Sequence, residues 1–138
     1  MALAFPGAQD DIWESGRCLA LDRNGAAVYH LMKVLEIGLK ILAAKFGITI
    51  DNKNWHPVIE QIEIKIKDMK NDVVWKNMPD FKEQERYYSQ VVAGFAILKN
   101  AWRNYTMHGN STYTHENAAN IFILIKMFMQ TLAEKLCE

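Results

Sequence analysis

The sequence predicts an all-α protein, a small bundle of about five helices. Apolar residues recur at steps of three and four through several long stretches, as on one face of a helix. Glycine, proline and asparagine separate these stretches. Half of the 138 residues are apolar, which suffices for one domain with a real core. We therefore expect residues 1–138 to form a single helical domain.

A first helix is predicted from Pro6 to about Asp22, with acidic residues in its first turns, where the helix dipole favours them. Arg17 follows Glu14 by three residues, and this spacing predicts a local ion pair rather than a phosphate site. The triplet Arg23-Asn24-Gly25 predicts the turn that ends this segment.

The second predicted helix, from Ala26 to Phe46, is the most apolar of the set, and Gly47 ends it. Its apolar arc is so wide that it needs cover on more than one side, which predicts contact with the core and with a partner chain. Its polar residues form a narrow stripe that faces either water or an active cleft: His30, Lys33, Glu36 and Lys40. The Glu36–Lys40 spacing favours water, and we expect a local partner for His30.

A third helix is predicted after Asn54, a suitable N-cap, with Pro57 in its first turn. Isoleucines at every second position from Ile62 to Ile66 also fit a strand. We prefer a helix because Glu and Lys are frequent here and the neighbouring segments are helical. Asn71 to Asp80 is predicted to be a loop in which three apolar residues fold back over the core: Val73, Val74 and Trp75.

A long helix is predicted from Phe81 to His108, with Gly109 as its end. One apolar stripe fixes its core-facing side: Tyr88, Val91, Val92, Phe95, Leu98, Trp102 and Tyr105. Thr114 is predicted to cap the last helix. That helix contains five successive apolar residues, 121–125, and like the second helix it is too apolar to leave its sides bare.

Charge and cysteine content narrow the function classes. Sixteen basic and sixteen acidic residues give a formal net charge of zero, which argues against a protein that coats nucleic acid through bulk electrostatics. Two cysteines, without C-x-x-C spacing, predict neither a disulfide scaffold nor a metal site, and they suit a reducing cytosol. No signal peptide, membrane-spanning run or phosphate-binding glycine loop is evident, so we expect a cytoplasmic protein without cofactor or metal.

One tight grouping of Arg, Asn and His stands near the end of the long helix: Arg103, Asn104 and His108. An imidazole can transfer a proton near pH 7, and a guanidinium can hold two phosphate oxygens, so the grouping suits a phosphodiester. On a regular helix Asn104 and His108 share a face, whereas Arg103 diverges from His108 by about 140° and can approach it only near a helix end. The structural alternative is that Arg103 is a surface or capping cation, that His108 complements the helix dipole, and that Asn104 is incidental. Spacing alone favours this alternative.

The segment from Arg103 to His108 resembles the R-x4-H signature of the HEPN superfamily, in which a polar residue, here Asn104, commonly follows the arginine. The likeness extends over most of the chain, through residues 26–36 and the closing helix. It implies a metal-independent endoribonuclease of a defence, toxin–antitoxin or RNA-processing system, with a composite site at a homodimer interface. In one subgroup a partner nucleotidyltransferase modifies a tyrosine two residues after the histidine, where this chain has Asn110. Other members are inactive dimerisation or binding modules.

The resemblance assigns roles to the grouping. His108 would transfer protons or activate the 2′-hydroxyl, Arg103 would stabilise charge on the phosphate, and Asn104 would orient the site. Three further residues are candidates for contacting RNA: Lys99, Tyr105 and His115. His115 is also the second candidate for the catalytic histidine, although it fits an exposed first-turn residue. The competing function is an inactive helical module that dimerises or binds a partner protein or RNA.

Overall fold

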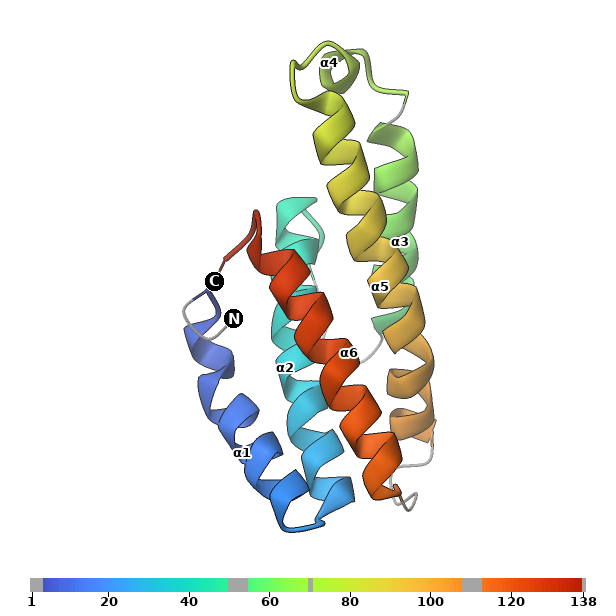
Figure 1. Cartoon of the computed structure of the whole chain (residues 1–138). Coiled ribbons are helices and arrows are strands. Elements are labelled where there is room, and N and C mark those ends of the chain that lie inside the picture. Colours follow the sequence, from blue (N-terminus) through green and yellow to red (C-terminus); the bar gives the residue numbers. More distant parts are fainter. Residues whose placement is uncertain (1–3, 50–54, 70, 108–112, 138) are drawn as a thin grey trace.

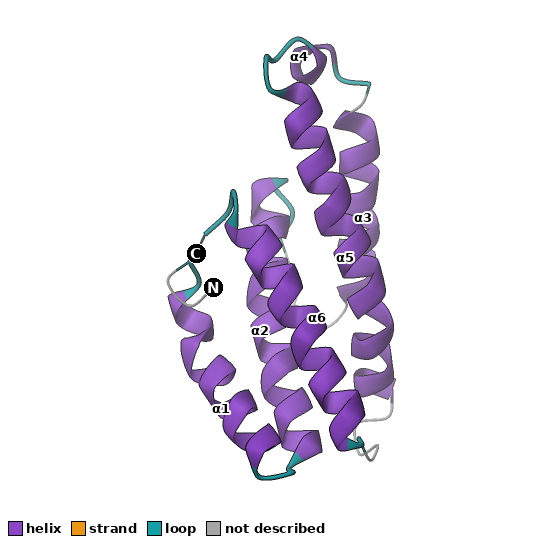
Figure 2. Cartoon of the chain, in the orientation of Figure 1, coloured by secondary structure: helices purple, strands orange, loops and turns teal. Residues whose placement is uncertain are grey.

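The computed structural model describes residues 4–49, 55–69, 71–107 and 113–137, and these residues form helices and connecting loops without a strand (Figure 2). A short 3-10 helix, η1, is followed by six α-helices: η1 (Pro6–Ala8), α1 (Gln9–Ala20), α2 (Asn24–Lys45), α3 (Trp55–Met69), α4 (Val73–Lys76), α5 (Phe81–Met107) and α6 (His115–Ala133). The predicted all-α bundle is confirmed, and the four-residue α4 accounts for the sixth helix. The isoleucine-rich segment is helical, as preferred.

Neighbouring helices form a continuous series in space. α1 packs on α2, α2 on α6, α6 on α5, and α5 on α3 (Figure 1). α3 and the first half of α5 extend together beyond the other helices, and α4 lies at the tip of this extension. The segment around residue 103 belongs to the other half of α5, beside the start of α6.

α2 lies between α1 and α6, and these two helices cover most of its apolar arc. Its core-facing residues are almost fully buried: Ala27, Val28, Leu31, Met32, Val34, Leu35, Leu39, Leu42 and Ala43. Gly38 allows close approach of α6, because a Cβ atom there would lie 2.7 Å from the Met129 sulfur and 3.3 Å from the Phe128 ring. The side of the arc formed by Ile37, Ile41 and Ala44 is less covered and lines an open pocket of about 600 Å³ with Leu136 and Cys137. Contact of α2 with a partner chain stays a prediction.

The predicted apolar stripe of α5 is buried where the structure describes it. Tyr88, Val91, Phe95 and Leu98 are at most 3% exposed, and Val92 is half-buried. The side chains of Trp102 and Tyr105 lie outside the described set. Phe95 meets Phe128 of α6 edge to face, with 4.8 Å between ring centres. This contact and its neighbours fix the rotation of α5, and with it the direction in which residues beyond the stripe point.

A buried hydrogen bond ties α5 to the C-terminal end of α6. The Tyr87 hydroxyl donates to the Leu132 carbonyl oxygen at 2.6 Å. Burial, with smaller contributions from neighbouring Tyr88 and Glu134, raises the pKa of the Tyr87 phenol well above its usual value. The phenol therefore keeps its proton and remains a donor across the physiological pH range.

The segment between α3 and α5 differs from the prediction. Val73 and Val74 are each 68% exposed instead of covering the core, and only Trp75 of the three packs partly against it. Asp72 caps a short helix here, its carboxylate accepting a hydrogen bond from the Val74 amide at 2.9 Å. At the tip of the α3–α5 extension no other helix lies near enough to cover these valines.

The first turn also lies earlier than predicted. α2 already begins at Asn24, and the chain reverses at Leu21–Arg23, where Asp22 has a positive φ of 56°. Aspartate tolerates this left-handed conformation better than most residues, so no glycine is needed. The Glu14–Arg17 and Glu36–Lys40 ion pairs are present as predicted, at 2.6 Å and 3.1 Å.

α1 begins at Gln9, three residues after the predicted start at Pro6, because residues 6–8 form the 3-10 helix η1. The predicted ends at Gly47 and Thr114 are confirmed. Gly47 has a φ of 69° just after α2, and the Thr114 hydroxyl accepts from the Asn117 amide at 3.1 Å at the start of α6. The predicted cap Asn54 and the turn residues after 107 lie outside the described part of the chain. In the described part, no helix combines the length and the apolar character needed to cross a membrane.

Candidate functional site

Arg103 and Asn104 belong to the last two turns of α5, which is helical at least as far as Met107. The Arg103 side chain is exposed. His108, the third residue of the grouping, lies outside the described residues, as does the side chain of Asn104. The structure therefore describes the helix that carries the motif and the position of Arg103. The approach of His108 to Arg103 stays a prediction.

Because α5 is a regular helix, positions 103 and 104 lie on different faces of it. Position 104 is seven residues after Ile97, two turns along the same face, whereas Arg103 lies in line with Lys99, one turn before it. Lys99 is half-buried and Arg103 is exposed. One side of the C-terminal half of α5 thus carries two cations one turn apart, which offer positive charge to an anion.

His115, the second candidate histidine, is the first residue of α6 and is exposed. Its Nδ1 atom lies 3.5 Å from a carboxylate oxygen of Asp22, which is exposed in the turn between α1 and α2. Such an exposed contact contributes little stability. The described geometry therefore brings His115 to the α1–α2 turn. The side chain of Tyr105, the remaining candidate for RNA contact, is outside the described set.

An apolar surface lies across α5 and α6, on the part of α5 that precedes the motif. We call it the α5–α6 face and define it by four exposed residues: Ile97 (59% exposed), Ile123 (52%), Leu124 (36%) and Met127 (59%). Three of them line a groove of about 150 Å³ between the two helices, whose other walls are Gln90, Gly94, Leu98, Phe128 and Thr131. Large apolar side chains exposed together mark an interaction surface.

The apolar run at 121–125 predicts that the last helix needs apolar cover, but nothing in the sequence predicts that α5 contributes to the same surface. Ile97 directly precedes Leu98 of the buried stripe and lies about 100° away from it around the helix. From the sequence, an isoleucine next to the buried stripe could equally be the buried edge of that stripe or an exposed residue. The rotation set by Phe95 and Phe128 turns Ile97 outward.

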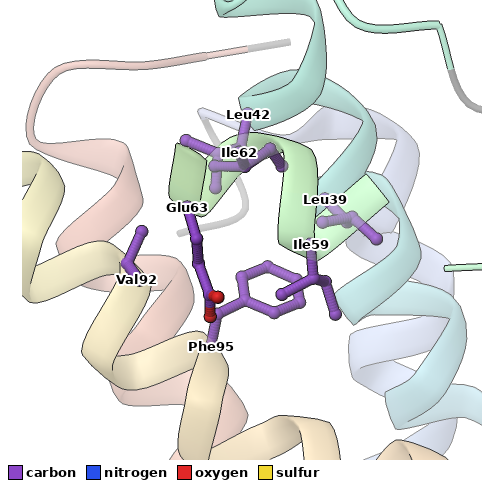
Figure 3. A pocket seen from close by; sticks show the side chains of 7 residues that line it. All are labelled: Leu39, Leu42, Ile59, Ile62, Glu63, Val92 and Phe95. Atoms are coloured by element: carbon purple, nitrogen blue, oxygen red, sulfur yellow. The ribbon is translucent and has the colours of Figure 1, made fainter. Parts of the chain in front are cut away.

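A second cavity lies among α2, α3 and α5 and is only about 10 Å³. Figure 3 shows the Glu63 side chain reaching past apolar neighbours towards Phe95. The other residues that line the cavity are apolar: Leu39, Leu42, Ile59, Ile62, Val92 and Phe95. A space of about this size holds at most a single water molecule, so it is a packing gap and not a substrate site.

One cluster of potential metal ligands occurs in the described part of the chain, at the contact between α1 and α2: Glu14, Cys18 and His30. No metal is predicted from the sequence, because the two cysteines lack the spacing of a zinc motif. The available signal was the four-residue step from Glu14 to Cys18, which places both on one face of α1. His30 joins them only through the packing of α2.

No protein-family model, curated protein or solved structure matches this chain.

Proposed function

We propose that this protein is a metal-independent endoribonuclease of the HEPN type that acts as a homodimer. The observation that carries the proposal is the R-N-x3-H motif, Arg103-Asn104 to His108, at the end of the longest helix of an all-α bundle, with the Arg103 side chain exposed. A guanidinium can hold the phosphate and stabilise charge on it, and an imidazole can transfer a proton near pH 7, so the motif supplies two of the functions that phosphodiester transfer needs.

The reaction uses the RNA's own 2′-hydroxyl. A base removes the proton of this hydroxyl, the 2′-oxygen attacks the adjacent phosphorus, and the bond from phosphorus to the 5′-oxygen breaks. An acid then protonates the leaving 5′-oxygen. The products are a 2′,3′-cyclic phosphate and a free 5′-hydroxyl. Arg103 stabilises the additional negative charge on the pentacoordinate phosphate, and Asn104 orients the histidine.

One motif supplies a single histidine, whereas the reaction needs a base and an acid. A two-fold axis would bring two His108 and two Arg103 side chains to one groove, because an isologous contact duplicates every residue near the axis. The α5–α6 face supports this arrangement. Ile97 of that face and position 104 are two turns apart on the same side of α5, so a two-fold axis that runs along this side, roughly parallel to α5, would place the two motif-bearing ends of α5 next to each other.

The second candidate function is an inactive module that dimerises or binds a helical partner. The specific observation in its favour is the same α5–α6 face, which offers an apolar groove whether or not the motif is active. The zero net charge agrees with a protein partner. The two functions differ in one respect that can be measured, namely RNA cleavage.

The deciding experiment incubates the purified protein with structured and unstructured RNA in EDTA. We expect cleavage with 2′,3′-cyclic phosphate ends, and no cleavage when the nucleotide before the cut carries 2′-deoxyribose. Persistence of cleavage at the 2′-deoxy position would refute the mechanism. Absence of cleavage on every RNA, from protein of native helicity, would favour the inactive module.

A further inference from the structure

Three side chains with metal-binding atoms converge where α1 and α2 pack together. Glu14 and Cys18 are four residues apart on α1, and His30 comes from α2. A carboxylate oxygen, the thiol sulfur and a ring nitrogen of these residues all lie within 4.8 Å of one another. All three residues are half-buried, so they are partly shielded from water and still open to an ion.

A fourth residue fixes the histidine. The Nδ1 atom of His30 lies 2.8 Å from a carboxylate oxygen of Asp11. When Nδ1–H donates this hydrogen bond, the lone pair of the neutral ring is on Nε2. A carboxylate that orients an imidazole in this way is the usual outer partner of a metal-bound histidine. Lys33 also approaches Asp11, at 3.4 Å, and holds that carboxylate from the α2 side.

We propose that α1 and α2 form a zinc site, with Glu14, Cys18 and His30 Nε2 as ligands and Asp11 as the positioning residue for His30. Sulfur, imidazole nitrogen and carboxylate oxygen are the donor types that zinc binds in proteins. The thiolate and the Glu14 carboxylate together neutralise the two positive charges of the ion. A water molecule or an external ligand completes the tetrahedron.

The required movement is small. Zinc bonds of about 2.0–2.3 Å in a tetrahedron place ligand atoms roughly 3.3–3.8 Å apart, so the cluster must contract by about 1 Å at its widest. Rotation about the side-chain bonds of Glu14 supplies this shift. Arg17 holds only the Oε1 atom of Glu14, at 2.6 Å, which leaves Oε2 for the ion, and this exposed ion pair is weak.

The site is separate from the motif on α5 and independent of the proposed ribonuclease chemistry. Its ligands join the two arms of the α1–α2 hairpin, so the bound ion would act as a cross-link between them. Because zinc binds the folded hairpin and not the unfolded chain, it raises the stability of the whole domain.

Cobalt titration of the full-length, reduced, metal-free protein tests the site. We expect one equivalent of Co²⁺ to produce a thiolate-to-cobalt charge-transfer band together with the intense visible bands of a tetrahedral ion, and Zn²⁺ to abolish both. Cys18→Ser should remove the charge-transfer band, whereas Cys137→Ser, which changes an exposed cysteine outside the cluster, should leave it intact. Loss of the band in Cys137→Ser alone, or a weak octahedral spectrum in the wild type, overturns the proposal.

Two more variants distinguish a built site from an adventitious thiol. His30→Gln should weaken Zn²⁺ binding at least tenfold, and Asp11→Asn should weaken it about 10–100-fold while keeping the charge-transfer band. Added Zn²⁺ should raise the thermal midpoint of the wild type and leave that of Cys18→Ser unchanged. If Cys18→Ser has lost its helical circular dichroism, Glu14→Gln takes its place and must weaken binding at least tenfold. Unchanged Zn²⁺ affinity in Glu14→Gln and His30→Gln contradicts the site.

Discussion

Replacement of His108 by alanine should lower the rate of RNA cleavage in EDTA by about 10²–10⁴-fold, because the site then lacks its proton-transfer group. Arg103→Ala should lower the rate by about 10²–10³-fold through loss of charge stabilisation at the phosphate. Arg103→Lys should fall between the wild type and Arg103→Ala, since lysine keeps the charge but not the two parallel hydrogen bonds. Initial rates on one RNA, at equal protein concentrations, measure all three effects.

Two matched variants control this series. Arg86→Ala removes an exposed arginine from the first turns of the same helix and should leave the rate unchanged. His115→Ala removes the second candidate histidine and should change the rate only a few-fold through weaker RNA contact. Equal residual cleavage in His108→Ala and Arg103→Ala, at the wild-type rate, would identify a contaminating nuclease. A loss in His115→Ala that exceeds the loss in His108→Ala would transfer the catalytic role to His115.

Met127→Glu should separate the proposed homodimer into monomers. Met127 is 59% exposed in the single chain and lies on the α5–α6 face, so a two-fold contact there would bury two of the new carboxylates among apolar side chains. Disruption at the centre of an interface typically costs about 2 kcal/mol or more, at least roughly thirtyfold in the dissociation constant. Sedimentation or light scattering at micromolar concentration measures the mass, and cleavage should fall together with it.

Val73→Glu provides the control, because it adds the same charge to an equally accessible apolar position at the tip of the α3–α5 extension. This variant should remain a dimer and remain active. A wild-type monomer at micromolar concentration would remove the argument for a composite site. Dissociation of both variants would indicate an effect of net charge instead of a specific interface.

The helices could be predicted because local signals agree with one another along most of the chain. The Thr114 side chain caps the start of α6, and the left-handed backbone of Gly47 follows the end of α2. Both features depend on only a few neighbouring residues. The predicted position of the first turn was wrong. Asp22 adopts the left-handed conformation there, although Gly25 is the residue nearby that adopts it most easily. The exposure of Val73 and Val74 could not be predicted, because it depends on whether another helix reaches the tip of the α3–α5 extension.

The candidate sites divide in the same way. The motif is contiguous in sequence, so its residues and their expected faces on a helix can be read from the sequence, although the resemblance and not the spacing singles them out. The α5–α6 face needs the packing of Phe95 against Phe128, which determines that Ile97 points outward. The α1–α2 cluster needs the register between two helices, because His30 meets Cys18 only after the chain has reversed at Asp22.

The most direct test of the central claim, that two subunits share one active site, is a mixing experiment. Wild-type subunits are mixed in equal amounts with subunits that carry both Arg103→Ala and His108→Ala, and the chains are allowed to exchange. If both motifs of a dimer are required, only the dimers with two wild-type subunits cleave RNA, and these are about a quarter of all dimers. Activity should then be about a quarter of that of pure wild type at the same total protein concentration. Activity of one half, the value for subunits that work independently, would contradict the shared site.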